Sequence, residues 1–100
     1  MTSPDDSARD PHGELMECRN AIEVVDQRIV ALLAQRVELA LRAARAKRDA
    51  GLPIVNTMRE ADVIHAALRA ASAEGLPADP VREIFRQIVG ISRRAQEDAR

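Results

Sequence analysis

Between Glu14 and Arg48, apolar residues recur at alternating steps of three and four positions, which places them on one face of an α-helix. No glycine or proline interrupts the sequence before Gly51 and Pro53. The pattern therefore predicts one unbroken helix over residues 14–48. Its apolar face consists of Leu15, Cys18, Ile22, Val25, Ile29, Leu32, Leu39, Ala43 and Ala46.

This first helix is too long to be covered by the rest of the chain. About 35 helical residues span roughly 52 Å, whereas a compact domain of 100 residues has a radius of gyration of only about 13 Å. An apolar face that extends beyond the remainder of the chain needs a partner. Small domains also bury too little of their own surface to be very stable alone. We therefore expect a homodimer in which the long helices pair.

A second helix is expected after the break at Gly51. Thr57 is followed three residues later by Glu60, which is the spacing of a capping box at a helix N-terminus. Gly75 and Pro77 are typical of the end of a helix. The apolar side of this helix is expected to contain Val63, Ile64, Ala67, Leu68 and Ala71.

The third helix and the N-terminal segment complete the expected organisation. Asp79 is expected to cap the third helix, with Pro80 at its first position. Residues 1–13 are polar and contain two prolines, so we interpret them as a disordered leader before one helical domain over residues 14–100. The expected fold class is all-α, with three helices per chain. The apolar side of the third helix consists of Val81, Ile84, Phe85, Ile88, Ile91 and Ala95.

The net charge and the types of residue present argue against several classes of function. With 15 basic and 16 acidic residues the net charge is −1, so we expect no nucleic-acid partner. The chain has no run of about 18 apolar residues, and its N-terminus is acidic, so neither a membrane span nor a signal peptide is expected. A single cysteine, Cys18, fits the reducing cytoplasm. His12 and His65 have no partner pattern for a metal or a nucleophile, so no cofactor is expected.

Arg36 occupies a position on the apolar face where Leu or Val is expected, and an unpaired charge there would be costly. One interpretation is a structural ion pair with a carboxylate such as Glu38 or Asp62. The other is an arginine that binds an anion, because the planar guanidinium can hold a carboxylate through two hydrogen bonds. The residues themselves leave both interpretations open.

Other polar residues could share a site with Arg36. Lys47 follows it by 11 residues, on the same face and roughly 16 Å along the axis, so the two side chains could converge on a small dianion. Arg19 precedes it by about 25 Å, which is too far within one helix. In an antiparallel helix pair, however, the partner's Arg19 could reach the site. Ser92 and Gln96 lie four residues apart, on one face of the third helix, and suit hydrogen bonding into a pocket.

Residues Cys18–Arg36 read CRNAIEVVDQRIVALLAQR, and Pro53–Glu60 reads PIVNTMRE. In the third helix, Ile84 and Phe85 precede Ser92 and Gln96. These three stretches resemble the first helix, the element after the first loop and the last helix of the AroQ-class, all-helical chorismate mutases. The resemblance covers residues 14–98. Further matches in the family's order and spacing are Glu38, Leu39, Ala46 and Lys47.

The resemblance implies an isomerase of the shikimate pathway of aromatic amino acid biosynthesis. It would rearrange chorismate, a small dicarboxylate, to prephenate in pockets shared between the two chains of an intertwined homodimer. A Claisen rearrangement needs no nucleophile and no metal, in agreement with the absence of such motifs. The family pattern implies that Lys47 and Gln96 face the ether oxygen that breaks, and that Lys47 also reaches a carboxylate.

The same pattern implies the other contacts with the substrate. Arg36 and Arg19 of the partner subunit would bind the two carboxylates, and Ser92 would contact one of them. Glu60 would hydrogen-bond the substituent at ring carbon C4, while Arg59 would support the pocket.

Asn56 departs from the family, which usually has Asp beside the C4 substituent. A mutase acting on 4-amino-4-deoxychorismate is therefore one alternative. Isochorismate pyruvate lyase on the same fold is a second, although its close relatives have a different loop between the first two helices. A third, of another class, is a catalytically silent helical dimerisation module. A partner enzyme of the same pathway is a further expectation.

Overall fold

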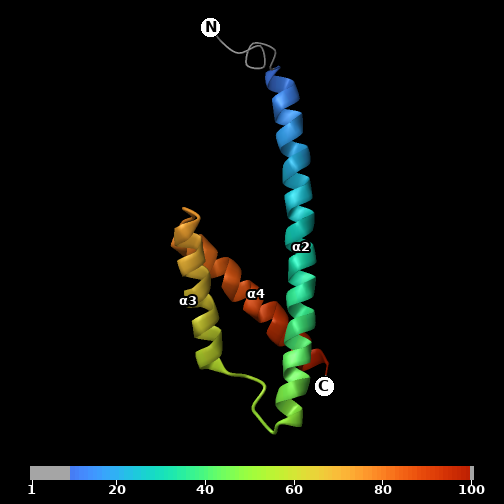
Figure 1. Ribbon diagram of the computed structural model, residues 1–100, viewed down its shortest axis with the longest axis vertical. Helices are drawn as coiled ribbons and strands as arrows, with labels where there is room; N and C mark the ends of the chain where they lie inside the picture. Colours follow the sequence, from blue (N-terminus) through green and yellow to red (C-terminus); the bar gives the residue numbers. More distant parts are fainter. Residues whose placement is uncertain (1–9, 100) are drawn as a thin grey trace. The chain divides into compact units, whose positions relative to one another are not determined.

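The structure, a computed structural model, describes residues 10–99 and consists of three α-helices joined by short loops (Figure 1). The helices are α2 (Pro11–Asp49), α3 (Thr57–Ala73) and α4 (Ala78–Asp98). No strand occurs within residues 10–99. The predicted all-α class, with one long helix followed by two shorter ones, is confirmed.

The first helix, α2, begins three residues earlier than predicted. Asp10 precedes it and accepts two hydrogen bonds, one through its side chain from the backbone N–H of His12 (3.1 Å) and one through its carbonyl from that of Glu14 (2.9 Å). Pro11 takes the first helical position, which suits proline because the N–H it lacks would have no helical acceptor there. The assignment of residues 11–13 to a disordered leader is therefore wrong. Residues 1–9 lie outside the described part of the chain.

The chain divides into two compact units, Met1–Leu32 and Leu33–Arg100. In the first unit, five large side chains on the apolar face of α2 are between 46% and 63% exposed. Cys18, on the same face, is exposed as well. A contiguous exposed apolar surface of this kind is typical of a protein–protein contact. The five residues are Leu15, Ile22, Val25, Ile29 and Leu32.

Glycines with positive φ end the first two helices, as predicted. Gly51 has a φ of 71°, a backbone conformation that residues with a Cβ rarely adopt. The N–H of Leu52 donates to the carbonyl of Lys47 at 2.8 Å, and that of Gly51 donates to the carbonyl three residues before it. This pair of hydrogen bonds is a Schellman motif, which satisfies carbonyls that the helix end leaves without partners. The same pattern follows Gly75, whose φ is 72°.

The second helix, α3, is capped by Asn56 and not by Thr57. The Asn56 side-chain oxygen accepts a hydrogen bond from the backbone N–H of Arg59 at 3.1 Å. Glu60 therefore lies one residue beyond the capping-box position, and its carboxylate binds Arg93 instead. The predicted capping box is wrong by one residue because Asn and Thr are both good N-caps, and the pattern does not distinguish them.

The third helix, α4, begins at Ala78 with Pro77 at the N-cap position, so the predicted Asp79 cap is also wrong. Asp79 lies in the first turn, where its carboxylate accepts a hydrogen bond from the Arg82 guanidinium at 2.5 Å. A negative charge in this turn also interacts favourably with the helix dipole. Pro80 is the third helical residue, a position where the N–H has no partner within the helix.

The Asn56 cap leads to a stability prediction. Asn56→Ala is expected to lower the free energy of unfolding by about 1 kcal/mol, because the first turn of α3 loses its side-chain acceptor. Thr57→Ala, at the neighbouring exposed position, is the matched control and is expected to change stability by no more than a few tenths of that amount. Urea unfolding of the two variants measures the difference, and equal losses would contradict the assignment of the cap.

Small residues form the most buried positions of the unit Leu33–Arg100. Ala44 of α2, Ala67 and Ala71 of α3, and Ser92 of α4 are each at most 9% exposed. The distance between packed helices depends on the side chains at their contact, and small ones allow a close approach. The predicted apolar side of α3 is buried or half-buried throughout. On the predicted apolar side of α4, by contrast, Ile84 and Ile91 remain exposed.

Candidate active site

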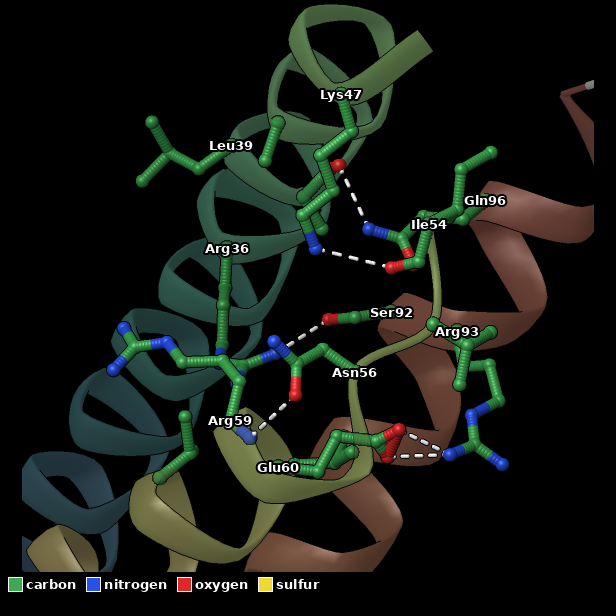
Figure 2. Close-up of a pocket in the computed structure, with 15 residues that line it drawn as sticks. Arg36, Leu39, Lys47, Ile54, Asn56, Arg59, Glu60, Ser92, Arg93 and Gln96 are labelled. Carbon is green, nitrogen blue, oxygen red and sulfur yellow. Dashed lines mark hydrogen bonds and ion pairs between the residues drawn. The ribbon is translucent and has the colours of Figure 1, made fainter. Parts of the chain in front are cut away.

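A cavity of about 300 Å³ lies among the second half of α2, the loop after it, α3 and α4 (Figure 2). All of its lining residues belong to the unit Leu33–Arg100. Seven of the eight residues that the sequence assigned to the site line it. These seven are Arg36, Lys47, Asn56, Arg59, Glu60, Ser92 and Gln96.

Arg36 enters the cavity from α2 and binds Ser92 of α4. Its Nη1 donates a hydrogen bond to the Ser92 hydroxyl at 2.5 Å. The two carboxylates proposed as structural partners, Glu38 and Asp62, are exposed, and neither lines the cavity. A guanidinium has five N–H donors and Ser92 occupies one of them, so Arg36 retains donors for an anion.

Lys47 lies 11 residues, or about three helical turns, after Arg36 on α2. The loop that follows the helix holds its side chain. Its Nζ donates to the carbonyl of Ile54 at 3.0 Å, while its own carbonyl accepts the Leu52 N–H. The ammonium therefore has a fixed position in the cavity wall. It has three N–H donors, so two remain for a ligand.

Gln96 extends from α4 towards α2. Its Nε2 donates to the carbonyl of Ala40 at 2.9 Å, which fixes the orientation of the amide because a carbonyl only accepts. The second N–H of the amide remains a donor for a ligand. Ser92 and Gln96 thus both contact α2 and line the same cavity, as their spacing on one helix face predicted.

Asn56 and Arg59 belong to the start of α3. Because a backbone N–H can only donate, the hydrogen bond from the Arg59 N–H identifies the capping atom of Asn56 as its oxygen. The amide nitrogen of Asn56, which is a donor, is then the group left for the cavity. Arg59 lines the cavity from the same turn and is exposed.

Glu60 is held by Arg93, a residue that the sequence analysis missed. Both carboxylate oxygens of Glu60 accept from Arg93 Nη2, the Oε2 contact at 2.5 Å, and Figure 2 shows the pair within the cavity lining. The hydrogen bond to Glu60 and the attraction of its charge raise the pKa of Arg93 above the usual arginine value. Arg93 lies three residues before Gln96, so its place on the same helix face was the available signal.

The cavity is strongly cationic. Its lining includes four positive side chains, namely Arg36, Lys47, Arg59 and Arg93, and one carboxylate, that of Glu60. The formal net charge of the lining is therefore +3. Fixed donors and excess positive charge in a partly enclosed space suit a small anion with more than one carboxylate.

Arg19 is the one predicted site residue that does not line this cavity. It lies in α2 within the unit Met1–Leu32 and is exposed. Its predicted role, in the site of a partner subunit, stays a prediction.

Residues 10–99 offer neither a membrane-spanning helix nor a cluster of metal ligands. No helix there is both long and apolar enough to cross a membrane. The same residues include no group of three or more His, Cys, Asp or Glu side chains arranged to hold a metal ion.

Comparison with known proteins identifies relatives of most of the chain. The T-protein of Enterobacter agglomerans is 33% identical over 85 residues, which is 85% of this chain and 23% of the relative. The bifunctional chorismate mutase/prephenate dehydratase of Escherichia coli K12 is 31% identical over 75 residues, 75% of this chain and 19% of the relative. A 3-dehydroquinate dehydratase of Pyrobaculum aerophilum is 42% identical over 55 residues, 55% of this chain and 18% of the relative.

The chain thus spans about a fifth of the length of these curated relatives. A model of the chorismate mutase type II family matches residues 18–97, nearly the range over which the sequence resembles that family. With the three-helix fold and the polar residues of the family pattern gathered around a cationic cavity, the chain belongs to the chorismate mutase type II family.

Proposed function

We propose that this protein catalyses the Claisen rearrangement of chorismate to prephenate. The observation that supports the proposal most directly is the cationic cavity lined by Arg36, Lys47 and Gln96. The substrate is a dianion, and the net positive charge of the lining favours its binding. The reaction is unimolecular, so the protein has to hold one conformer and stabilise the charge that develops as a bond breaks.

Binding of the carboxylates is assigned to the arginines. Arg36 offers a guanidinium whose orientation is fixed by Ser92, and a guanidinium–carboxylate pair can form two parallel hydrogen bonds. The second carboxylate is assigned to Arg19 of the partner subunit. Binding at both ends restricts the flexible side chain of chorismate to a folded, chair-like conformer. This restriction can supply much of the rate enhancement of such a reaction.

Stabilisation of the transition state is assigned to Lys47 and Gln96. As the ether bond breaks, negative charge accumulates on its oxygen. Both side chains are held by backbone carbonyls, those of Ile54 and Ala40, so their remaining N–H donors need little rearrangement when the charge develops. Donors fixed before the reaction stabilise such charge far better than donors that must reorient.

The shared pocket requires a homodimer, which is part of the proposal. The exposed apolar face of α2 in the unit Met1–Leu32 supports it, because pairing with a second copy would remove these side chains from water. Arg19 lies on the same half of the helix. A partner enzyme that uses prephenate is a further proposal, suggested by the bifunctional name of the Escherichia coli relative.

An assay with three substrates tests the function. Purified protein is expected to convert chorismate to prephenate at least about 10⁶-fold faster than the uncatalysed reaction, followed by the loss of chorismate absorbance. Release of pyruvate from isochorismate would instead indicate a lyase, and exclusive use of 4-amino-4-deoxychorismate would indicate the amino-specific mutase. No turnover of any of the three would indicate a silent dimerisation module and would contradict the proposal.

A further inference from the structure

We infer that Arg93 is a specificity-determining residue: by neutralising Glu60, it makes the pocket accept a hydroxyl group and reject an ammonium group on the ring of the substrate. This inference rests on the proposed function and deepens it, because it selects between chorismate and its 4-amino analogue. Its basis is the distribution of charge and hydrogen-bonding groups in the cavity.

Charge first determines which end of the substrate faces Glu60. Arg36 and Lys47 offer cationic donors, whereas Glu60 supplies the one carboxylate of the lining. Figure 2 shows Glu60 and Arg93 at one end of the cavity, and Lys47 and Gln96 at the other. Arg36 and Lys47 are held by neutral acceptors, the Ser92 hydroxyl and the Ile54 carbonyl, whereas the charge of Arg93 is already paired with Glu60. The carboxylates of a dianion are therefore attracted to Arg36 and Lys47, so the uncharged part of the ring with its substituent lies towards Glu60.

Arg93 then changes what Glu60 can offer to that substituent. Both carboxylate oxygens accept from Arg93 Nη2, and an arginine stays protonated at any working pH. Glu60 therefore acts as half of a neutral pair and not as a free anion. Each oxygen still has a lone pair available, so it can accept a hydrogen bond from a hydroxyl.

Asn56 reinforces this selection. Its oxygen is occupied by the N-cap hydrogen bond to the Arg59 N–H, which leaves the amide nitrogen as a donor for the cavity. A hydroxyl can accept from Asn56 and donate to Glu60 at the same time. An ammonium group can only donate, so it cannot use Asn56.

An ammonium group would also add a positive charge where the cavity has little to balance it. The lining already carries a formal charge of +3, and the only carboxylate is paired with Arg93. An amine attached to the ring is largely protonated at neutral pH, as simple amines are. The weakened attraction of the paired Glu60 and the lack of an acceptor at Asn56 therefore act against the amino analogue and leave chorismate unaffected.

The test compares kcat/KM for chorismate and 4-amino-4-deoxychorismate in several variants. Arg93→Gln frees the Glu60 carboxylate and is expected to raise the amino-to-hydroxyl ratio of kcat/KM by about tenfold or more, the range of one charge-assisted hydrogen bond. Arg93→Lys keeps the positive charge and is expected to retain most of the wild-type ratio. In Glu60→Gln/Arg93→Gln the gain should disappear, because the freed carboxylate is its cause. Arg94→Gln, at an exposed position outside the cavity, is the matched control and should leave the ratio unchanged.

Asn56→Asp provides a second test that does not depend on Arg93. Aspartate keeps the N-cap and adds an unpaired carboxylate oxygen, so this variant should also raise the ratio. An unchanged ratio in Arg93→Gln, or a wild-type preference for the amino compound, would overturn the inference, and an unchanged ratio in Asn56→Asp would overturn the part of it that concerns Asn56. Wild-type protein that converts neither compound would instead overturn the proposed function.

Discussion

Lys47→Ala is expected to lower kcat for the chorismate rearrangement by about 10²–10³-fold, the usual effect of removing one donor that stabilises transition-state charge. The Lys47 ammonium is held in the cavity wall by the Ile54 carbonyl, so its position does not depend on the substrate. Stopped-flow or steady-state measurement of chorismate consumption gives the change. Since the charge on the ether oxygen is largest in the transition state, kcat should fall more than KM rises.

Arg48→Ala is the matched control for this prediction. Arg48 is the next residue of α2, carries the same charge, is exposed and does not line the cavity. The control should keep near-normal turnover, and both variants should keep the helical circular dichroism of the parent. Near-normal turnover in Lys47→Ala would show that the ammonium is not part of the catalytic machinery.

Mixing two inactive variants is expected to restore activity. Arg36→Ala and Arg19→Ala should each lose most turnover, because each pocket is proposed to need Arg36 of one chain and Arg19 of the partner subunit. In a mixed dimer of the two variants, one pocket receives both substitutions and the other receives none. Statistical exchange of subunits should therefore recover about one quarter of the parent activity.

A same-residue mixture is the control for this experiment. Arg36→Ala mixed with a tagged Arg36→Ala chain cannot form an intact pocket, so it should stay inactive. Activity in the cross-mixture without any in the control supports a pocket shared between subunits. An inactive cross-mixture, with exchange of tagged and untagged chains demonstrated, would contradict the proposal that Arg36 of one chain and Arg19 of the partner subunit act in the same pocket.

Helix number and helix ends differed in how far they could be predicted. The unbroken apolar period and the glycines at positions 51 and 75 specified three helices, because a positive φ at each break has few alternatives to glycine. The N-termini were less certain. Asp10, Asn56 and Pro77 precede the helices in the structure, whereas the sequence indicated a first helix from residue 14 and caps at Thr57 and Asp79 for the other two. Several residue types cap well, and local geometry decides among adjacent candidates.

The sequence indicated those site residues that broke the apolar pattern or matched the family. It did not indicate a residue whose role depends on pairing with a side chain far away in the sequence. Arg36 drew attention because a charge replaced an apolar residue, and its partner proved to be Ser92. Arg93 neither broke the apolar pattern nor stood among the positions that resemble the family, and its spacing from Gln96 was its one signal. Its importance comes from Glu60, 33 residues away, and only the packing of α3 on α4 brings the two together.

The double attachment of Lys47 to its loop has an evolutionary consequence. Loops between helices usually tolerate insertions, since a longer connection costs little conformational entropy. Here the backbone carbonyl of Lys47 accepts the Leu52 N–H and its side chain donates to the Ile54 carbonyl. Under the proposed function, an added or deleted residue between positions 48 and 55 would displace the catalytic cation even if the helices still folded. We therefore expect selection to remove variants with a changed loop length because they lose catalytic activity, and not because they lose stability.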